Sequence, residues 1–235
     1  MFNFFLNLPS FLIRKIKAKK LSYSLSGVDL LIDYIFKNKK KGFYIDIGCN
    51  HPVYSNNTYL LYKRGWKGIN IDLDAKSIEL FNNFRKNDVN INAALSSSVK
   101  DLDLYFYHDK SPINTINKAN TLIHIDKPKI KKIKTQSLND ILINSNFSNV
   151  EIDFISIDVE GHELEVLKGI NFDQYIPKII SIEYLDTSLK KIDIKNFKLE
   201  NVLNSKIYKF LLEKNYRLVN WLHSDLIFAH KSFID

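Results

Sequence analysis

The feature that most constrains this chain is a regular alternation of short β-rich runs and amphipathic stretches, which begins at residue 42. Core strands are predicted at 43–47, 67–73, 89–94, 151–159 and 178–184. Helices are predicted between them at 55–64, 75–85, 138–144 and 163–167. Elements that alternate in this way predict an α/β fold, in which helices cover both faces of a parallel sheet.

Two further regions extend this pattern. After a predicted helix at 205–214, strands are expected at 216–221 and 225–229, and the short turn between them makes them antiparallel. The run 102–107 alternates cleanly and predicts an extra, half-exposed strand. The segment 109–134 is the least regular, and its last eight residues include five lysines. It is either a loop that covers substrate, followed by a basic strand, or a solvated insertion.

Positive charge is concentrated near the N-terminus. The chain has 235 residues and a formal net charge of +8, but nine of its 34 Lys and Arg, and only two of its 26 acids, lie in residues 1–41. The rest is nearly neutral, so we expect no nucleic-acid partner. We expect a basic N-terminal segment at 1–41 and a single domain at 42–235. The single cysteine, Cys49, excludes a disulfide framework and favours a reducing, cytoplasmic setting.

Residues 1–20 place apolar side chains first and positive charge after them, which is the reverse of a secretory signal. The stretch either forms a helix on a membrane surface, at the inner face of the membrane, or docks as an oligomer contact. We expect a homo-oligomer. The apolar runs of the sequence all stay well below about 18 residues, the length that a membrane span requires.

Polar residues gather where the predicted strands end, and in an open α/β sheet ligands bind beyond those ends. The polar residues at these places are Asp46, Asp72, Asn92, Asp158, Glu160 and Glu183. Helix capping explains one or two such carboxylates but not five, because each buried carboxylate needs water, a partner or a ligand. One glycine, Gly48, follows the first strand, so a pyrophosphate has no cradle, whereas a cofactor with adenosine and no phosphate fits.

The strongest local signal is the run DVEGHE at 158–163, directly after a core strand. A glycine permits a sharp turn there, and four ionisable groups lie within six residues. Ionisable groups that lie so close together shift each other's pKa values in different directions, which is typical of acid–base or metal chemistry. We expect functional roles for Asp158 and His162, and an exposed position in the first helical turn for Glu163.

These residues match a family. The stretches YIDIGCNHPVYSNNTYLLYKRGWKGINIDLD (44–74), NAAL (92–95), FISIDVEGHELEVLKGI (154–170) and IISIEY (179–184) resemble the FkbM-type S-adenosylmethionine-dependent methyltransferases. The resemblance implies a Rossmann-like class I sheet of seven strands in the order 3-2-1-4-5-7-6, with helices on both faces and an antiparallel last strand. It also implies O-methylation of a sugar hydroxyl, on a nucleotide-activated sugar or a precursor of a bacterial surface polysaccharide.

The resemblance assigns roles to residues as well. Asp46, Gly48 and Asn50 would contact the methionine part of the cofactor, Asp72 the ribose, and Asn92 and Ala93 the adenine. Asn57, Thr58 and Asp158 complete the cofactor-binding candidates. A sugar hydroxyl is a poor nucleophile and needs a general base or a divalent cation, for which the candidates are Asp158, Glu160, His162 and Glu183. Asp158 and Glu183 occupy the places where related methyltransferases hold magnesium, so Mg²⁺ or Mn²⁺ is a further candidate cofactor.

Several alternatives stay open at this point. A methyltransferase for another small-molecule or lipid-linked acceptor has the same signature. A nicotinamide-dependent sugar-nucleotide enzyme would need a three-glycine turn, which this chain lacks. An adenine-N6 methyltransferase would show an Asn/Asp-Pro-Pro-aromatic turn where DVEG stands. A non-catalytic binding module would have no need of the acid cluster.

Overall fold

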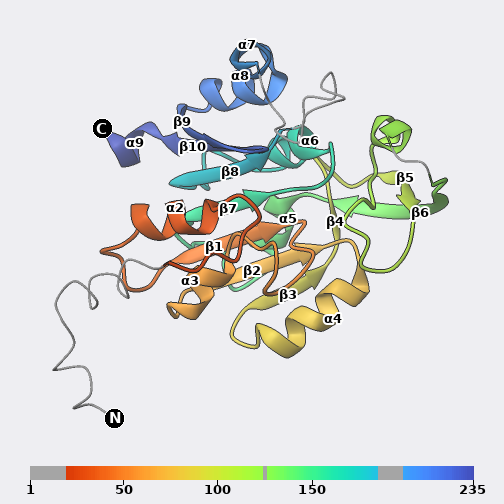
Figure 1. The fold of residues 1–235 in the computed structure, drawn as a ribbon, viewed down its shortest axis with the longest axis horizontal. Helices are drawn as coiled ribbons and strands as arrows, with labels where there is room; N and C mark the ends of the chain where they lie inside the picture. Colours follow the sequence, from red (N-terminus) through yellow and green to blue (C-terminus); the bar gives the residue numbers. More distant parts are fainter. Residues whose placement is uncertain (1–19, 124–125, 185–197) are drawn as a thin grey trace.

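The computed structural model describes residues 20–123, 126–184 and 198–235. The helix expected within residues 1–20 therefore lies outside the described residues, apart from Lys20. The protein forms a central sheet with helices on both faces, as the alternation of elements predicts (Figure 1). None of the helices in the described ranges is both long and apolar enough to span a membrane.

The central sheet has seven strands. Their spatial order is β3 (Val89–Asn92), β2 (Lys67–Asp72), β1 (Phe43–Ile47), β7 (Phe154–Ile157), β8 (Ile179–Glu183), β10 (Asp225–His230) and β9 (Tyr216–Leu222). The first five strands run parallel, and β10 is antiparallel to both of its neighbours. The carboxyl ends of β1, β2 and β7 therefore meet at one edge of the sheet.

A second, three-stranded sheet explains why this order differs from the predicted 3-2-1-4-5-7-6. The chain between β3 and β7 adds β4 (Ala94–Leu95), β5 (Asp101–Phe106) and β6 (Lys129–Gln136), which the predicted numbering leaves out. Strand β5 is the predicted extra strand, and β6 is the lysine-rich run. Figure 1 shows β5 and β6 at one end of the molecule, beyond β4.

Helices form two apolar layers against the central sheet. On one face, buried side chains of α5 (Leu138–Ile143), α6 (Glu163–Lys168), α7 (Leu199–Asn204) and α8 (Lys206–Glu213) join a core cluster with the strands. On the other face, α2 (Val28–Ile35) and α3 (Tyr59–Lys63) pack in a second cluster, and α4 (Ala75–Phe84) packs against β2 and β3. Short helices η2 (Lys118–Ile123) and α9 (Lys231–Ile234) complete the fold.

Two helices differ from the sequence-based expectation. Helix α3 begins at Tyr59 rather than at Ser55, because Ser55 has a φ of 48° and the side chain of Asn56 accepts hydrogen bonds from the backbone N–H of Thr58 and Tyr59. Helix α2 was not predicted, and it lies within the segment 1–41. Its residues Val28 and Ile32 are fully buried. The division of the chain at residue 42 stays a prediction.

Candidate functional site

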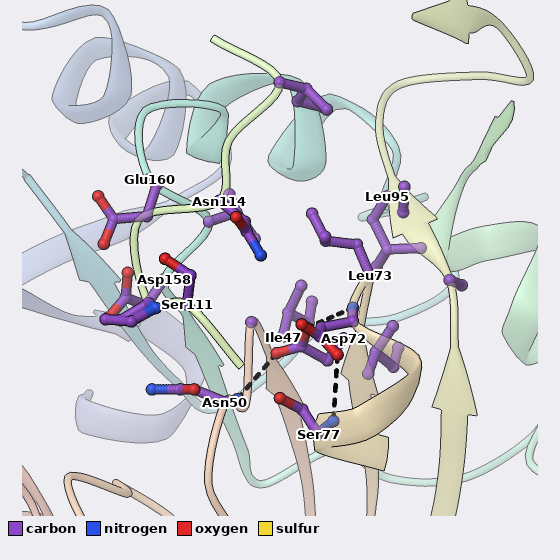
Figure 2. A pocket seen from close by; sticks show the side chains of 18 residues that line it. Ile47, Asn50, Asp72, Leu73, Ser77, Leu95, Ser111, Asn114, Asp158 and Glu160 are labelled. Atoms are coloured by element: carbon purple, nitrogen blue, oxygen red, sulfur yellow. Dashed lines mark hydrogen bonds between the residues drawn. The ribbon is translucent and has the colours of Figure 1, made fainter. Parts of the chain in front are cut away.

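A pocket opens at the carboxyl ends of β1, β2 and β7, where the sequence predicts the site. The candidates that line it are Gly48, Asn50, Asp72, Ala93, Asp158 and Glu160. Figure 2 shows Asp158 and Glu160 at one side of the pocket and Asp72, Leu73 and Leu95 at the other. The remaining candidates, Asp46, Asn57, Thr58, Asn92, His162 and Glu183, do not line it.

Asp72 lies at the end of β2 with both carboxylate oxygens oriented by the backbone. One oxygen accepts a hydrogen bond from the N–H of Asp74 at 2.7 Å, and the other from the N–H of Asn50 at 2.8 Å. Burial raises the pKa of Asp72 to about 6, against the effect of these two bonds. Asn92 supports the same strand end, because its amide donates to the carbonyl of Asp72 at 3.0 Å.

Gly48 allows β1 to end directly against β7. It has a φ of 74°, and a Cβ atom there would lie 1.6 Å from the carbonyl oxygen of Asp158. A side chain is therefore excluded by the protein itself, whatever the pocket holds. The next residues continue the tight turn, since Asn50 has a φ of 48°.

Asp46 and Thr58, both cofactor candidates, belong instead to a buried polar network under the turn. Asp46 accepts hydrogen bonds from Asn56 at 3.0 Å and from Thr58 at 2.8 Å. Arg85, which is fully buried, donates to Asn56 at 2.6 Å and forms an ion pair with Asp88 at 3.6 Å. Burial raises the pKa of Asp46, whereas the hydrogen bond from Thr58 and the charge of Arg85 lower it. These side chains hold the loop after β1 rather than facing the pocket.

Arg85 is the residue of this region that sequence reasoning missed. Its guanidinium also donates to the carbonyl of Pro52 at 2.8 Å and to the hydroxyl of Tyr44 at 2.9 Å, and it lies against aromatic rings of α3 and α4. Its side-chain hydrogen-bond partners lie 27 to 41 positions earlier in the sequence, whereas Asp88 follows three positions later. A lone arginine after a helix gives no local signal of such a role.

Three carboxylates gather on the β7 side of the pocket. Oxygen atoms of Asp158, Glu160 and Glu183 lie within 4.8 Å of one another. Burial, and then repulsion from Asp158, raise the pKa of Glu183 to about 11, so this residue holds a proton at neutral pH. Burial and the charge of Glu160 also raise the pKa of Asp158, which solvent still reaches at the mouth of the pocket. Glu183 lies behind the pocket, paired in register with Asp225 of β10.

Asn57 lies behind these carboxylates. Its amide donates to the hydroxyl of Ser156 on β7 at 3.1 Å and also contacts Asp225. It links the loop after β1 to β7 and β10, and it does not line the pocket.

The turn after β7 differs from expectation at two positions. Glu163 was expected to be exposed, but it is buried, because its carboxylate accepts the backbone N–H groups of Gly161 at 2.8 Å and Val159 at 3.2 Å. His162 points away from the pocket, with Nε2 at 3.0 Å from the hydroxyl of Ser96, and burial lowers its pKa. The structure therefore does not bring His162 to the acid cluster.

Residues 107–120, here named the covering segment, close the pocket on its remaining side. Ser111, Pro112, Asn114 and Ile116 line the pocket. The segment is fixed at its start because the carboxylate of Asp74 accepts the N–H of Lys110 at 2.5 Å. The segment lines the pocket and the lysine-rich run forms strand β6, as the first of the two alternatives predicts; that the loop covers substrate stays a prediction.

A family model for the FkbM methyltransferase domain matches residues 46–218, which is most of the chain. The chain belongs to the FkbM methyltransferase family. It is therefore an S-adenosylmethionine-dependent methyltransferase, and the nicotinamide-dependent and non-catalytic alternatives do not hold.

Solved structures and curated proteins add little to the family assignment. Precorrin-6y C5,15-methyltransferase from Geobacter metallireducens GS-15 is 10% identical, with a TM-score of 0.44 over 91% of this chain and 93% of that one. A TehB-like SAM-dependent methyltransferase from Corynebacterium glutamicum ATCC 13032 Kitasato is 12% identical, with a TM-score of 0.45 over 94% and 96%. A search of the curated proteins finds no significant match.

The pocket of this methyltransferase fits the charge of its cofactor. Asp72, Asp74, Asp158 and Glu160 line it, and no lysine or arginine does so in the part of the chain that the structure describes. S-adenosylmethionine carries a sulfonium and an ammonium group and has no phosphate, so an acidic lining is complementary to it. The pyrophosphate of a dinucleotide would face the same carboxylates without a cationic partner.

Proposed function

We propose that the protein transfers the methyl group of S-adenosylmethionine to a hydroxyl of a sugar, carried by a nucleotide-activated sugar or a surface-polysaccharide precursor. The observation that carries the proposal is the cluster of Asp158, Glu160 and Glu183 at one side of an acidic pocket. Carboxylates accept hydrogen bonds from hydroxyl groups, and a sugar presents several hydroxyl groups close together.

At the other side of the pocket, Asp72 would accept hydrogen bonds from the two ribose hydroxyls. Its oxygens are already oriented by the N–H groups of Asp74 and Asn50, and each oxygen keeps a second lone pair. Ala93 and Leu95 would contact the adenine ring with apolar surface. When bound, S-adenosylmethionine supplies an electrophilic methyl group.

Asp158 is the residue that we propose as general base. It lines the pocket, and Glu183 behind it holds a proton that the two carboxylates share. A raised pKa suits a base, because it strengthens the pull on the hydroxyl proton as the oxygen attacks. Glu160 would accept a neighbouring hydroxyl and orient the acceptor. His162 has no part in this proposal.

A divalent cation is a second way in which the same carboxylates could activate the hydroxyl. Its support is that Glu183 Oε2 is buried, and no hydrogen-bond partner reaches it within the described residues. Hard cations such as Mg²⁺ take oxygen ligands of this kind. Exhaustive EDTA treatment distinguishes the two: loss of turnover that Mg²⁺ or Mn²⁺ restores supports the cation, and full activity excludes it.

Phosphate groups of the acceptor would lie outside the acidic pocket. The lysines of β6, among them Lys129, Lys131 and Lys132, are a dense source of positive charge inside the catalytic domain, and none of them lines the pocket. We propose that they attract an anionic acceptor. Salt screens this attraction over a Debye length of about 8 Å at physiological ionic strength, so added salt should raise the KM of the acceptor. A neutral or lipid-linked acceptor would give a KM that salt leaves unchanged.

Location and partners are part of the same proposal. We propose a cytoplasmic protein because the single cysteine favours a reducing setting. The N-terminal segment supports peripheral contact at the inner face of the membrane or a contact between copies of the chain. We propose no nucleic-acid partner, since the rest of the sequence is nearly neutral. Deletion of residues 1–19 should remove the membrane contact or the contact between copies of the chain, and it should leave turnover unchanged.

A methyl-transfer screen tests the proposed function. Nucleotide-activated sugars and short glycans are incubated with the protein and S-adenosylmethionine, and products are analysed by mass spectrometry. A product heavier by one methylene, absent without the protein, supports the proposal. Transfer only to nucleic acid, or to none of the sugars while S-adenosylhomocysteine binds, would contradict it.

A further inference from the structure

The turn that carries the acceptor-side carboxylates has an unusual backbone. Glu160 has a φ of 55° and Gly161 a φ of 93°, so two successive residues lie in the left-handed region. For a residue with a side chain, such as Glu160, this conformation is unfavourable and persists when the surroundings hold it. The surroundings of this turn therefore decide where the carboxylate of Glu160 lies.

The backbone of the turn is held from two sides. From below, the carboxylate of Glu163 accepts the N–H groups of Val159 and Gly161. From above, the covering segment supplies three donors to two carbonyl oxygens. The carbonyl of Glu160 accepts the hydroxyl of Thr115 at 2.8 Å and the amide of Asn120 at 2.5 Å, and that of Gly161 accepts the amide of Asn117 at 2.9 Å.

The packing around Gly161 shows how closely the two segments fit. A Cβ atom at Gly161 would lie 2.6 Å from the side-chain nitrogen of Asn117 and 2.7 Å from that of Asn120. Glycine is therefore required for the two amides to reach the turn. Thr115 and Asn120 are themselves buried, so water does not compete for these hydrogen bonds.

We propose that Thr115, Asn117 and Asn120 are positioning residues, whose hydrogen bonds to the turn align Asp158 and Glu160 with the acceptor hydroxyl. The inference rests on the proposed function, since it takes Asp158 and Glu160 as the acceptor-side groups. The same covering segment lines the pocket through Ser111 and Asn114, so the pocket wall and the turn form one unit. A small displacement of such groups is enough to slow a reaction strongly.

The chain offers a matched set of variants for the test. Thr115→Val removes the hydroxyl that donates to Glu160 and keeps the shape of the side chain, whereas Thr115→Ser restores a hydroxyl. Thr121→Val is the control, because the hydroxyl of Thr121 bonds to the carbonyl of Lys118 within η2 and does not touch the turn. Asn120→Asp removes the other hydrogen bond to the carbonyl of Glu160, because it replaces the amide donor with an acceptor.

Two measurements on the full chain decide the inference. Amide hydrogen exchange of the turn reports how often it opens. We expect exchange at least about tenfold faster in Thr115→Val, which removes the bond to Glu160 and the acceptor of the Asn117 N–H, and in Asn120→Asp, which places an acceptor against the Glu160 carbonyl. Turnover of the acceptor found in the methyl-transfer screen should fall about tenfold in kcat, with affinity for S-adenosylhomocysteine within twofold of the original. Thr115→Ser and Thr121→Val should match the unmodified protein in both measurements.

The outcomes separate this inference from the proposed function. If Thr115→Val and Thr121→Val change exchange and kcat equally, the effect is a general loosening, and the inference is overturned. Unchanged exchange in the turn overturns it as well. A protein that binds S-adenosylhomocysteine but methylates no sugar overturns the proposed function. In that case the exchange data alone decide whether hydrogen bonds from the covering segment stabilise the turn after β7.

Discussion

The two sides of the pocket are built in different ways. The cofactor side, from Gly48 to Leu95, comes from a single stretch of about 50 residues, and the buried acids Asp46 and Asp88, which support this stretch without lining the pocket, lie around Arg85. The acceptor side joins the covering segment to the ends of β7 and β8, which lie about 40 residues or more further along the chain. No lysine or arginine forms an ion pair with Asp158 or Glu183 within the described ranges.

The buried acids near the cofactor side therefore have a structural role, whereas those of the acceptor side are suited to chemistry. On the cofactor side, Asp88 forms an ion pair with Arg85, and Asp46 accepts hydrogen bonds from Asn56 and Thr58, so these carboxylates stabilise the loop after β1. On the acceptor side, burial first and then neighbouring carboxylates raise the pKa of Asp158 and of Glu183, which costs stability and leaves Glu183 protonated at neutral pH. Substitutions on the two sides should therefore affect different quantities.

The largest expected effect is on turnover, from the acceptor side. Asp158→Asn keeps the shape of the side chain and removes its ability to accept a proton. We expect kcat to fall about 10²- to 10⁴-fold, the usual contribution of a general base. His162→Gln is the matched control, because the ring contacts Ser96 and does not face the cluster. A larger loss in His162→Gln than in Asp158→Asn would reverse the assignment of the base.

The largest expected effect on stability comes from the cofactor side. Arg85→Met leaves Asp46 and Asp88 buried without their cation, and we expect the free energy of unfolding to fall by about 3–5 kcal/mol. Chemical denaturation measures it. Lys76→Met, which removes the exposed pair with Glu79, should leave the unfolding free energy unchanged. Equal losses in the two variants would mean that the buried network adds no stability.

The fold could be predicted from the sequence because its signals are local. Strand Phe43–Ile47 and helix Ala75–Phe84 follow from runs and periods within a few residues, and the polar strand ends indicate which edge binds ligands. Helix α2 was missed because it follows a segment whose charge and apolar residues suggested a separate arm. The second sheet also changed the strand numbering. Its strand β4 is only two residues long, too short for a pattern of alternating side chains to indicate it.

The details of the site depended on contacts that the sequence does not display. Asp46 and Thr58 match the position of cofactor contacts, but Arg85, which lies more than 25 residues away, binds their network. Glu163 has the sequence position of an exposed first-turn residue, yet two backbone N–H groups of the preceding turn bind its carboxylate. Such roles depend on which side chain the tertiary structure brings near a backbone group, and a local pattern carries no information about that.

A smaller effect, on the pH dependence of cofactor affinity, again separates the two sides. Burial raises the pKa of Asp72 from 3.8 to about 6, so the folded protein keeps the proton to a higher pH than the unfolded chain does. Ribose hydroxyls donate to the ionised form, so affinity for S-adenosylhomocysteine should be about tenfold weaker at pH 5 than at pH 8, by the one-group titration.

The raised pKa of Asp72 also determines how the stability of the fold changes with pH. Between pH 3.8 and about 6 the folded state binds more protons, so the contribution of Asp72 to the free energy of unfolding should fall as pH rises, by up to about 3 kcal/mol. Asp72→Asn is the control in both measurements, since it cannot titrate. A pH dependence that the variant retains would assign it to another group.

Calorimetry of S-adenosylhomocysteine on the unmodified protein, Asp72→Ala and Asp158→Asn tests most directly whether the pocket has separate cofactor and acceptor sides. We expect Kd to rise thirtyfold or more in Asp72→Ala, roughly 2–3 kcal/mol for the loss of charge-assisted hydrogen bonds to the ribose. In Asp158→Asn it should stay within about threefold of the unmodified value, although kcat falls. An unchanged Kd in Asp72→Ala, or equal losses in the two variants, would contradict the division of the pocket into a cofactor side and an acceptor side.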